Sequence, residues 1–293
     1  MSIWNAQTYR EQLPDDFVEF RKLLEGYSRI PPDAVENHLH AIRDKAWAVA
    51  SFPCVGMWSF TNLNYMQDPQ FKTVISRLRD GSSDEIFLDV ACGLGQVLRK
   101  LSADGVDPKK LYGTDILPEY LELGFDLFKD RDRFEQNNFI TADLIHNDKA
   151  LAQLEGKITV VHASNFFHLF GWEEQILIGE NIVKLFERRH QGVLLFGWQI
   201  GRLDAGTMTS YKTGNTRYLH NLSSLQTLWD DIGAKTETKW KVDAELLGKL
   251  PFQIPGFPED TRYLKFSVSR LEVAQHTAGQ AVADTYNRLN IDI

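Results

Sequence analysis

The chain has 293 residues, of which 43% are hydrophobic and 25% charged, as expected for a globular protein with one large α/β domain or two modest ones. Acidic residues outnumber basic ones by 40 to 32, and the formal net charge of -8 disfavours nucleic acid as a partner, because duplex binding needs a basic face. Two cysteines exclude a disulfide framework, and no apolar run approaches the roughly 20 residues that a membrane helix needs. We therefore expect a cytoplasmic protein whose partner is neither nucleic acid nor a membrane.

The first 80 residues carry helical patterns. Three helices are expected there, at residues 15–27, at residues 33–50 and from Asp68 to just before Gly81. The second helix follows Pro31 and Pro32, and its apolar residues recur every three or four positions on one face. The segment 52–65, between the second and third helices, is rich in aromatic residues and poor in charge. We expect residues 1–80 to form a helical region that contributes to a substrate pocket and to a homodimer surface.

From residue 85 the pattern changes to short apolar strands that alternate with amphipathic helices. Strands are expected at residues 86–91, 110–114, 139–142, 158–163 and 193–198, and helices at residues 96–102, 118–129, 149–154, 173–188 and 223–232. Two further strands, 236–242 and 263–269, are separated by a Pro/Gly-rich loop and suit an antiparallel edge pair. The alternation predicts an α/β fold with a Rossmann-like, mostly parallel sheet of seven strands within residues 81–270, to which the N-terminal helices are an addition. No element is assigned to the tail, residues 271–293.

A glycine-rich segment follows the first expected strand. Residues 87–96 close this strand and open a helix, with Ala91, Gly93 and Gly95 in three positions that call for small residues. There the backbone turns tightly against a ligand, and a larger side chain would take the ligand's place. Such a run is a weak signal alone, but Asp115 ends the next strand, one strand–helix–strand step further on. A carboxylate at that point can accept hydrogen bonds from both hydroxyls of a ribose.

These features fit either a nicotinamide dinucleotide or S-adenosylmethionine, and three observations favour the second ligand. Asp89 lies within the strand, ahead of the glycines, where a carboxylate suits a cationic ammonium and repels a pyrophosphate. The pyrophosphate fingerprint requires a glycine where this chain has Gln96. The strand expected at 139–142 is followed by Asp143 and Leu144, which can accept a hydrogen bond from adenine and pack on its ring.

On these segments the chain resembles the class I methyltransferases, which use S-adenosylmethionine. Residues 89–95 resemble their glycine-rich first motif, with Ala91 in place of the usual first glycine. Residues 113–116 resemble the ribose-binding segment, and residues 142–144 resemble the adenine-binding segment. Residues 162–165 fall where the fourth strand of the family ends beside the sulfonium. The resemblance implies that the cofactor-binding residues are Asp89, Ala91, Gly93, Gly95, Asp115, Ile116, Asp143, Leu144 and Asn165.

A closer resemblance covers most of the chain. The segments 27–32 (YSRIPP), 42–47 (IRDKAW) and 112–117 (YGTDIL) resemble fungal methyltransferases that tailor meroterpenoids. In that family the methyl acceptor is usually a carboxylic acid and the product is a methyl ester. The resemblance therefore implies O-methylation of a small terpenoid carboxylate in secondary metabolism. O- or C-methylation of a phenolic, polyketide-type molecule is an alternative, and a non-catalytic methyltransferase-like binding subunit is a weaker one.

The sequence indicates the residues that contact the methyl acceptor less clearly than those that bind the cofactor. Trp58 can line a substrate pocket or belong to the core, and Trp198 and Gln199 end the fifth strand at the ligand-bearing edge of the sheet. His162 and His168 flank the end of the fourth strand, where an acid–base residue can sit, although structural roles are the simpler interpretation. The candidate acceptor contacts are Trp58, His168, Trp198 and Gln199.

The sequence assigns no catalytic residue and no metal site. No pair of histidines has the spacing of metal ligands. A carboxylic acid, with a pKa of about 4, is ionised at neutral pH and needs no general base, whereas a phenol with a pKa of about 10 usually does. The lack of an evident base in the sequence therefore favours an acid as the acceptor.

Overall fold

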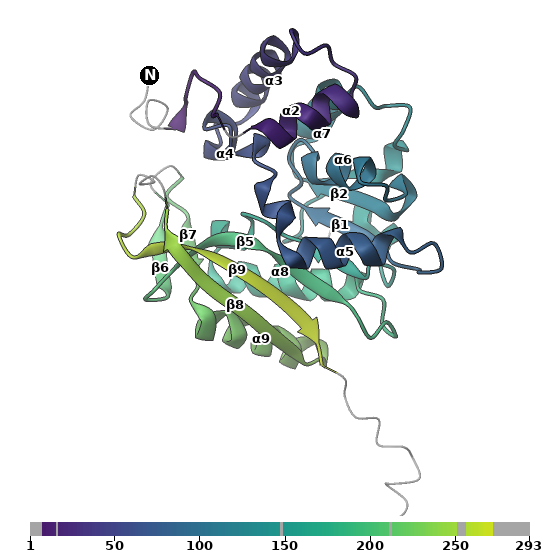
Figure 1. Ribbon diagram of the computed structural model, residues 1–293. Coiled ribbons are helices and arrows are strands. Elements are labelled where there is room, and N and C mark those ends of the chain that lie inside the picture. Colours follow the sequence, from purple (N-terminus) through teal and green to yellow (C-terminus); the bar gives the residue numbers. More distant parts are fainter. Residues whose placement is uncertain (1–7, 16, 147–148, 211–212, 251–255, 272–293) are drawn as a thin grey trace, which may run out of the picture.

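The computed structural model describes residues 8–15, 17–146, 149–210, 213–250 and 256–271, and a seven-stranded sheet lies at its centre (Figure 1). The strand order is β3-β2-β1-β4-β5-β9-β8. The strands are β1 Phe87–Val90, β2 Leu111–Asp115, β3 Phe139–Thr141, β4 Val160–His162, β5 Leu194–Arg202, β8 Trp240–Lys249 and β9 Thr261–Arg270. β1 to β5 are parallel, and β9 pairs antiparallel with both β5 and β8. The expected Rossmann-like sheet with an antiparallel edge pair is confirmed.

Helices cover both faces of this sheet. α5, α6 and α7 pack on one face, and α8 and α9 pack on the other (Figure 1). Their bounds are α5 Pro69–Arg79, α6 Gln96–Ala103, α7 Pro118–Phe128, α8 Trp172–Leu185 and α9 Leu222–Thr236. Because neighbouring side chains of a strand point to opposite faces, Phe87 belongs to the core under α5 to α7 and Leu88 to the core under α8 and α9. No helix within the described ranges combines the length and the apolar character needed to cross a bilayer.

The N-terminal helices lie on the α7 side of the sheet and share its core. They are α2 Val18–Gly26, α3 Val35–Val49 and α4 Pro53–Gly56, followed by the 3₁₀ helices η1 Ser59–Thr61 and η2 Asn64–Gln67. The hydroxyl of Tyr120 on α7 lies 2.9 Å from the carbonyl oxygen of Ala50 and 3.2 Å from that of Ala46. One cluster of buried side chains contains both Leu39 of α3 and Leu127 of α7. These helices, called the N-terminal layer below, therefore pack on the sheet-forming part instead of around a separate core.

Two elements differ from the sequence-based prediction in type or position. Residues 149–154 form a 3₁₀ helix, η5, in place of the expected α-helix. α9 continues to Thr236, and Glu237 then adopts a left-handed φ of 55° that ends the helix. β8 consequently begins at Trp240, later than predicted. Other short 3₁₀ helices are η3 Pro108–Lys110, η4 Gln136–Asn138 and η6 Phe167–Leu169.

A hairpin after β5 is absent from the sequence-based prediction. It consists of β6 Gly206–Thr209 and β7 Thr216–Leu219, which pair antiparallel as a separate two-stranded sheet. Most of its side chains are exposed or half-buried, so neither strand needs apolar residues at alternate positions. The sequence therefore lacks the alternating pattern by which a strand is predicted. The hairpin nevertheless matters for the site, because the chain enters it directly from β5.

A fully buried ion pair joins α6 to the turn that follows α7. Nε and Nη2 of Arg99 donate to the two carboxylate oxygens of Asp130 at 2.9 and 3.2 Å, and neither side chain is exposed. The Tyr27 hydroxyl also donates to Asp130, at 2.9 Å. The guanidinium carbon of Arg99 lies 4.1 Å from the centre of the Phe139 ring. The pair thus links the N-terminal layer, α6 and β3 in a place that water does not reach.

Arg99→Leu is expected to lower the free energy of unfolding by about 3–5 kcal/mol, because it leaves Asp130 as a buried charge without its partner. Urea unfolding measures the loss. The matched control is Arg131→Leu, which breaks an exposed pair with Glu122 and should stay within about 1 kcal/mol of the wild type. Equal losses from the two substitutions contradict the structural role of the buried pair.

Candidate functional site

The glycine-rich segment forms the turn between β1 and α6. Ala91, Gly93 and Gly95 all have left-handed backbone angles, with φ of 53°, 58° and 68°. A Cβ added at Gly93 meets no protein atom within 4 Å, so the space in front of this backbone is open to a ligand. A Cβ added at Gly95 would lie 2.2 Å from the Arg99 guanidinium, so this glycine is required by packing. The two glycines therefore serve different purposes: Gly93 leaves open space in front of its backbone, and Gly95 allows the Arg99 side chain to pack closely.

Asp115 ends β2 beside this turn and is largely buried. Its two carboxylate oxygens accept hydrogen bonds from the backbone N–H of Gly93, at 2.9 Å, and of Leu117, at 3.0 Å. Burial raises the pKa of the carboxyl, and these hydrogen bonds offset part of the rise. Each oxygen has a second lone pair, so the group can still accept hydrogen bonds from ribose hydroxyls. The neighbouring side chain of Ile116 is 60% exposed and offers an apolar surface to a nucleoside.

Asp143 and Leu144 follow β3 at the same edge of the sheet. The Asp143 carboxylate accepts from the Ile145 N–H at 2.8 Å and lies 2.7 Å from Nδ1 of His146. Burial raises the pKa of Asp143, but the hydrogen bonds from His146 and Ile145 outweigh burial and hold the pKa below its ordinary value. The Leu144 side chain lies mostly in the core under α8, so only a small part of it faces the edge. A contact of either residue with adenine stays a prediction.

Asp89 on β1 is hydrogen-bonded to His162 on β4, its neighbour in the parallel register. Nδ1 of His162 lies 2.7 Å from Oδ1 of Asp89, and Nε2 lies 2.7 Å from Oγ of Ser164. The Ser164 hydroxyl accepts a hydrogen bond from the Trp198 N–H on β5, at 3.2 Å. If Nδ1 of His162 carries the proton, both ring nitrogens and the Ser164 hydroxyl are satisfied. The network spans the point where the strand order reverses, which is where open α/β sheets bind ligands.

The sequence marks Asp89 and His162 separately but does not show that they pair. They are 73 residues apart, and only the register of β1 against β4 brings their side chains together. Asp89 is expected from the sequence to face a cationic ammonium, and in the structure one of its oxygens is already taken by His162. The other oxygen has no hydrogen-bond partner within the described ranges and is the one that a cofactor ammonium can use.

Residues of the N-terminal layer and α5 close over this network. The Tyr65 ring lies parallel to the His162 ring, with centroids 6.3 Å apart and an interplanar angle of 5°. Phe71 packs against the same imidazole, at a centroid distance of 5.2 Å. Burial, together with the nearby charge of Asp89, raises the pKa of the Tyr65 hydroxyl, so this group stays protonated at neutral pH. The N-terminal region therefore reaches the site, and its contact with the acceptor stays a prediction.

Trp58 lies away from this site, in the core of the N-terminal layer. Its indole N–H donates to the carbonyl oxygen of Arg10 at 3.0 Å, and the Arg43 guanidinium lies 4.2 Å from its ring centre. The His40 ring contacts it edge-on at 4.9 Å. The residue is only 1% exposed and is enclosed by protein, which favours the core role over the pocket role among the two that the sequence leaves open.

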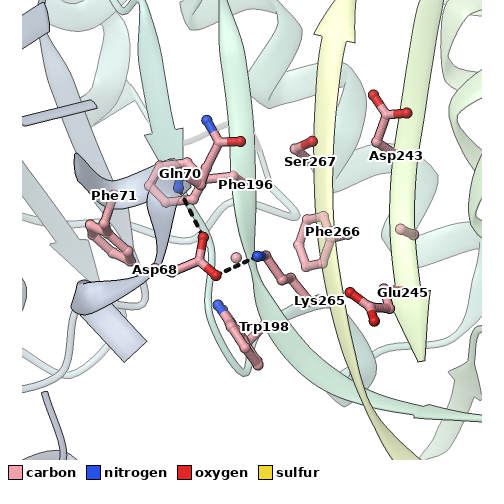
Figure 2. Close-up of a pocket in the computed structure, with 12 residues that line it drawn as sticks. Asp68, Gln70, Phe71, Phe196, Trp198, Asp243, Glu245, Lys265, Phe266 and Ser267 are labelled. Carbon is pink, nitrogen blue, oxygen red and sulfur yellow. Dashed lines mark hydrogen bonds and ion pairs between the residues drawn. The ribbon is translucent and has the colours of Figure 1, made fainter. Parts of the chain in front are cut away.

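Trp198 and Gln199 are neighbours on β5 and point to opposite faces of the sheet. Trp198 lines a groove of about 270 Å³ between the start of α5 and strands β9 and β8 (Figure 2). Lys265 crosses this groove, where it pairs with Asp68 and places its Nζ 5.6 Å from the centre of the Trp198 ring. Gln199 is fully buried on the other face. The structure therefore does not bring these two expected acceptor contacts into one pocket.

His168, on η6, is buried on the same side of the sheet as β7. Burial lowers its pKa to about 3, with a further contribution from the positive charge of Arg217, so the ring is neutral at pH 7. Arg217 lies on β7, in the hairpin that the sequence does not reveal, and no motif in the sequence points to it. Within the described ranges, no group of three or more His, Cys, Asp or Glu side chains is arranged to hold a metal ion.

Comparison with known proteins gives consistent matches. The profile of a family described as meroterpenoid methyltransferase N-terminal domain matches residues 8–61. O-methyltransferase atr3 of Stereocaulon alpinum is 38% identical over 252 residues, which cover 86% of this chain and 72% of that protein. O-methyltransferase phiE of a fungal species is 36% identical over 82% of this chain and 79% of that protein. The asnovolin E/chermesin D methyltransferase nvfJ of Aspergillus novofumigatus is 33% identical over 76% of this chain and 79% of that protein.

Solved structures are more distant. The chain is similar to the Burkholderia thailandensis 1,6-didemethyltoxoflavin-N1-methyltransferase, with 12% identity and a TM-score of 0.46 over 78% of this chain and 91% of that one. It is also similar to the DhpI–SAH complex, with 15% identity and a TM-score of 0.42 over 82% of this chain and 98% of that one. Family membership rests on the curated relatives, of which the chain covers more than two thirds.

Asp115→Ala is expected to weaken the binding of S-adenosylmethionine by about 2–3 kcal/mol, or about 30- to 150-fold, because two ribose hydroxyls lose a charged acceptor. Isothermal titration calorimetry measures the loss, and thermal unfolding checks that the fold persists. Asp143→Asn is the comparison and should have a smaller effect, since an amide oxygen still accepts from an adenine amino group. Unchanged affinity in Asp115→Ala, or equal losses in both variants, is incompatible with ribose binding by Asp115.

Proposed function

Because the chain belongs to the family of fungal S-adenosylmethionine-dependent methyltransferases of secondary metabolism that these relatives represent, we propose that it methylates the carboxylate of a terpenoid-derived acid. Family membership confirms the resemblance found in the sequence, and S-adenosylmethionine is the methyl donor. The choice of a carboxylate as the acceptor rests on the arrangement of polar groups at the site. The product of the proposed reaction is a methyl ester.

The residues at the carboxyl ends of β1, β2 and β3 fit this cofactor. Gly93 leaves open space in front of its backbone, Asp115 retains acceptor capacity for a ribose, and one oxygen of Asp89 is free to accept from an ammonium. Asn165 follows β4, with a left-handed φ of 53° and its N–H bonded to the Trp198 carbonyl oxygen at 2.6 Å. When bound, the cofactor supplies an electrophilic methyl group on a sulfonium. The proposed cofactor contacts are Asp89, Ala91, Gly93, Gly95, Asp115, Ile116, Asp143, Leu144 and Asn165.

The proposed transfer needs no proton acceptor. One oxygen of the acceptor carboxylate forms a bond to the methyl carbon while the bond from sulfur to that carbon breaks, which gives a methyl ester and S-adenosylhomocysteine. The oxygen, the carbon and the sulfur must be nearly collinear, so the main task of the protein is to hold this geometry and to exclude water. A carboxylic acid with a pKa of about 4 arrives already ionised at neutral pH.

The observation that carries this proposal is the bonding of His162. It is the histidine that ends β4, and both of its ring nitrogens already have protein partners, Asp89 and Ser164. Its ring is also buried under Tyr65 and Phe71. A histidine held in this way is suited to fix the ends of β1, β4 and β5 in position, and it has no free nitrogen with which to take a proton from an acceptor.

Methylation of a phenol is the second candidate, and the same network is what favours it. A phenol on the acceptor could pass its proton to Ser164 while Ser164 passes its own to Nε2 of His162, with Asp89 stabilising the imidazolium. This route reverses the direction of the hydrogen bond between Ser164 and His162 and leaves a buried imidazolium beside Asp89. An acid acceptor leaves the network intact, which is why we prefer it.

The pH dependence of kcat separates the two acceptors. With an acid that the enzyme accepts, kcat should stay nearly flat from about pH 6 to 8, because a carboxyl group with a pKa of about 4 is ionised throughout. His168, whose pKa is about 3, does not change its charge in this range. Initial rates with labelled S-adenosylmethionine provide the profile. A rate that rises tenfold per pH unit indicates deprotonation of a weak acid, and the ester-forming proposal is then wrong.

Ser164→Ala serves as the control for this profile. If the network only positions the strand ends, the substitution lowers kcat by the same factor at every pH. If Ser164 relays a proton, the loss becomes smaller as the pH rises, because the phenol then ionises without help. A pH-dependent loss would therefore support the phenol.

A further inference from the structure

Three side chains on the α8 side of β5 bury polar atoms that lack hydrogen-bond partners. The side chains are those of Gln199, His168 and Arg217. The atoms without a partner among the described residues are Nε2 and Oε1 of Gln199, Nδ1 of His168 and Nε of Arg217. Gln199 is 0% exposed and His168 is 5% exposed. A buried polar group without a partner costs about 1–3 kcal/mol, and most such groups in native proteins are satisfied. Several of them in one region call for a specific explanation.

The fold brings these side chains to one place from three elements. The Trp198 carbonyl oxygen accepts from the Asn165 N–H, so the segment that leads into η6 and His168 runs beside this part of β5. The Arg202 N–H donates to the His220 carbonyl oxygen at 2.9 Å, which fixes the end of β7 against the end of β5. Gln199 lies on β5 between these two attachment points. Its side chain shares a face with Gly201, where an added Cβ would lie 2.5 Å from the His220 oxygen.

A separate network holds η6 and β7 together. The Tyr218 N–H on β7 donates to the Phe170 carbonyl oxygen at 2.9 Å. Nε2 of Gln175 on α8 lies 3.0 Å from the same Phe170 oxygen and 3.1 Å from the Tyr218 carbonyl oxygen, so it bridges the two segments. His220 contacts Oε1 of Gln175 at 2.9 Å. His168 and Arg217 are therefore carried on a fixed frame, in which their unpartnered atoms are not a result of loose packing.

Arg217 is the charged member of the cluster, and it has no counter-ion among the described residues. Burial lowers the pKa of its guanidinium, and no carboxylate among the described residues offsets that effect. Charges that are removed from water are normally paired, because an isolated one is costly to desolvate. The residue is only partly exposed, whereas His168 and Gln199 are buried, so an anion that arrives from solvent meets the guanidinium first.

We propose that Arg217, with His168 and Gln199, forms the receptor for the carboxylate of the methyl acceptor. This inference rests on the proposed function, and it names the residues that recognise the acid. The guanidinium supplies the charge that pairs with one carboxylate oxygen, while the amide of Gln199 and the neutral ring of His168 supply further hydrogen bonds. The cluster follows the end of β4 and lies along β5, beyond the network of Asp89, His162 and Ser164.

The proposed receptor also has different affinities for the substrate acid and for the product ester. An ionised carboxylate pairs with a guanidinium, whereas a methyl ester has no charge and keeps only weak acceptor capacity. The site therefore binds the acid more tightly than the ester, which favours release after transfer. A phenol acceptor, which is neutral at pH 7, gains no such pairing.

The test uses the 293-residue chain saturated with S-adenosylhomocysteine, and two probes of the same shape, 2-naphthoate and 2-naphthamide. Calorimetric titration should show that the wild type binds the acid at least about tenfold more tightly than the amide, which corresponds to about 1.4 kcal/mol. Arg217→Gln should abolish this preference, and Arg217→Lys should retain part of it because the charge remains. The affinity for S-adenosylhomocysteine should stay within about twofold in both variants, which shows that the fold and the cofactor site are intact.

Arg188→Gln is the matched control, since Arg188 is exposed after α8, near the start of β5 and far from the carboxyl ends of the strands. It should keep the preference for the acid. The inference is overturned if the wild type shows no preference for naphthoate, or if Arg217→Gln keeps the wild-type preference. Turnover of a panel of terpenoid acids and phenols with labelled S-adenosylmethionine tests the proposed function separately. Acids methylated equally well by Arg217→Gln overturn only the receptor, whereas turnover of phenols and of no acid overturns the proposed function.

Discussion

One buried hydrogen bond, between His162 and Asp89, joins β4 to β1 where the strand order of the sheet reverses. β1 leads into the glycine-rich turn, and β4 leads through Ser164 towards η6, so this bond fixes the cofactor side of the site against the acceptor side. Asp89 is buried, and a buried carboxylate needs such a donor. The resulting rigidity suits an in-line displacement, whose rate depends on the near-attack geometry of its reactants.

Hydrogen bonds from β5 also fix the segment that follows β4, on the acceptor side of the site. The N–H of Trp198 bonds to the Ser164 hydroxyl, and its carbonyl oxygen bonds to the N–H of Asn165, so the segment that follows β4 is tied to one residue of β5 at two points. The next residue, Gln199, is buried on the face of β5 where we place the cluster with Arg217, while the Trp198 ring lines a groove on the opposite face. The groove and the cluster thus lie on opposite faces of the sheet, and the cluster combines buried polar atoms with a guanidinium that has no counter-ion among the described residues.

The features that depend on short stretches of sequence could be predicted. The alternation of apolar strands and amphipathic helices indicated the doubly wound sheet, and a small-residue turn followed by Asp115 indicated a nucleoside. Features that depend on tertiary packing were not predictable. Trp58 has the composition of a pocket wall or of a core residue, and only its enclosure by Arg43 and His40 decides between them. Arg217 lies on a hairpin without an apolar pattern, and its burial follows from contacts with η6 and β5.

The chemical position of the transferred methyl group tests the proposed acceptor most directly. An acceptor is first methylated by the enzyme with S-adenosylmethionine that carries a labelled methyl group, and the product is then treated with mild alkali. A methyl ester releases the label as methanol, whereas an aryl ether or a carbon-bound methyl group retains it. Methylation of a carboxylate predicts release of nearly all of the label, and retention of the label in the hydrolysed product would contradict it.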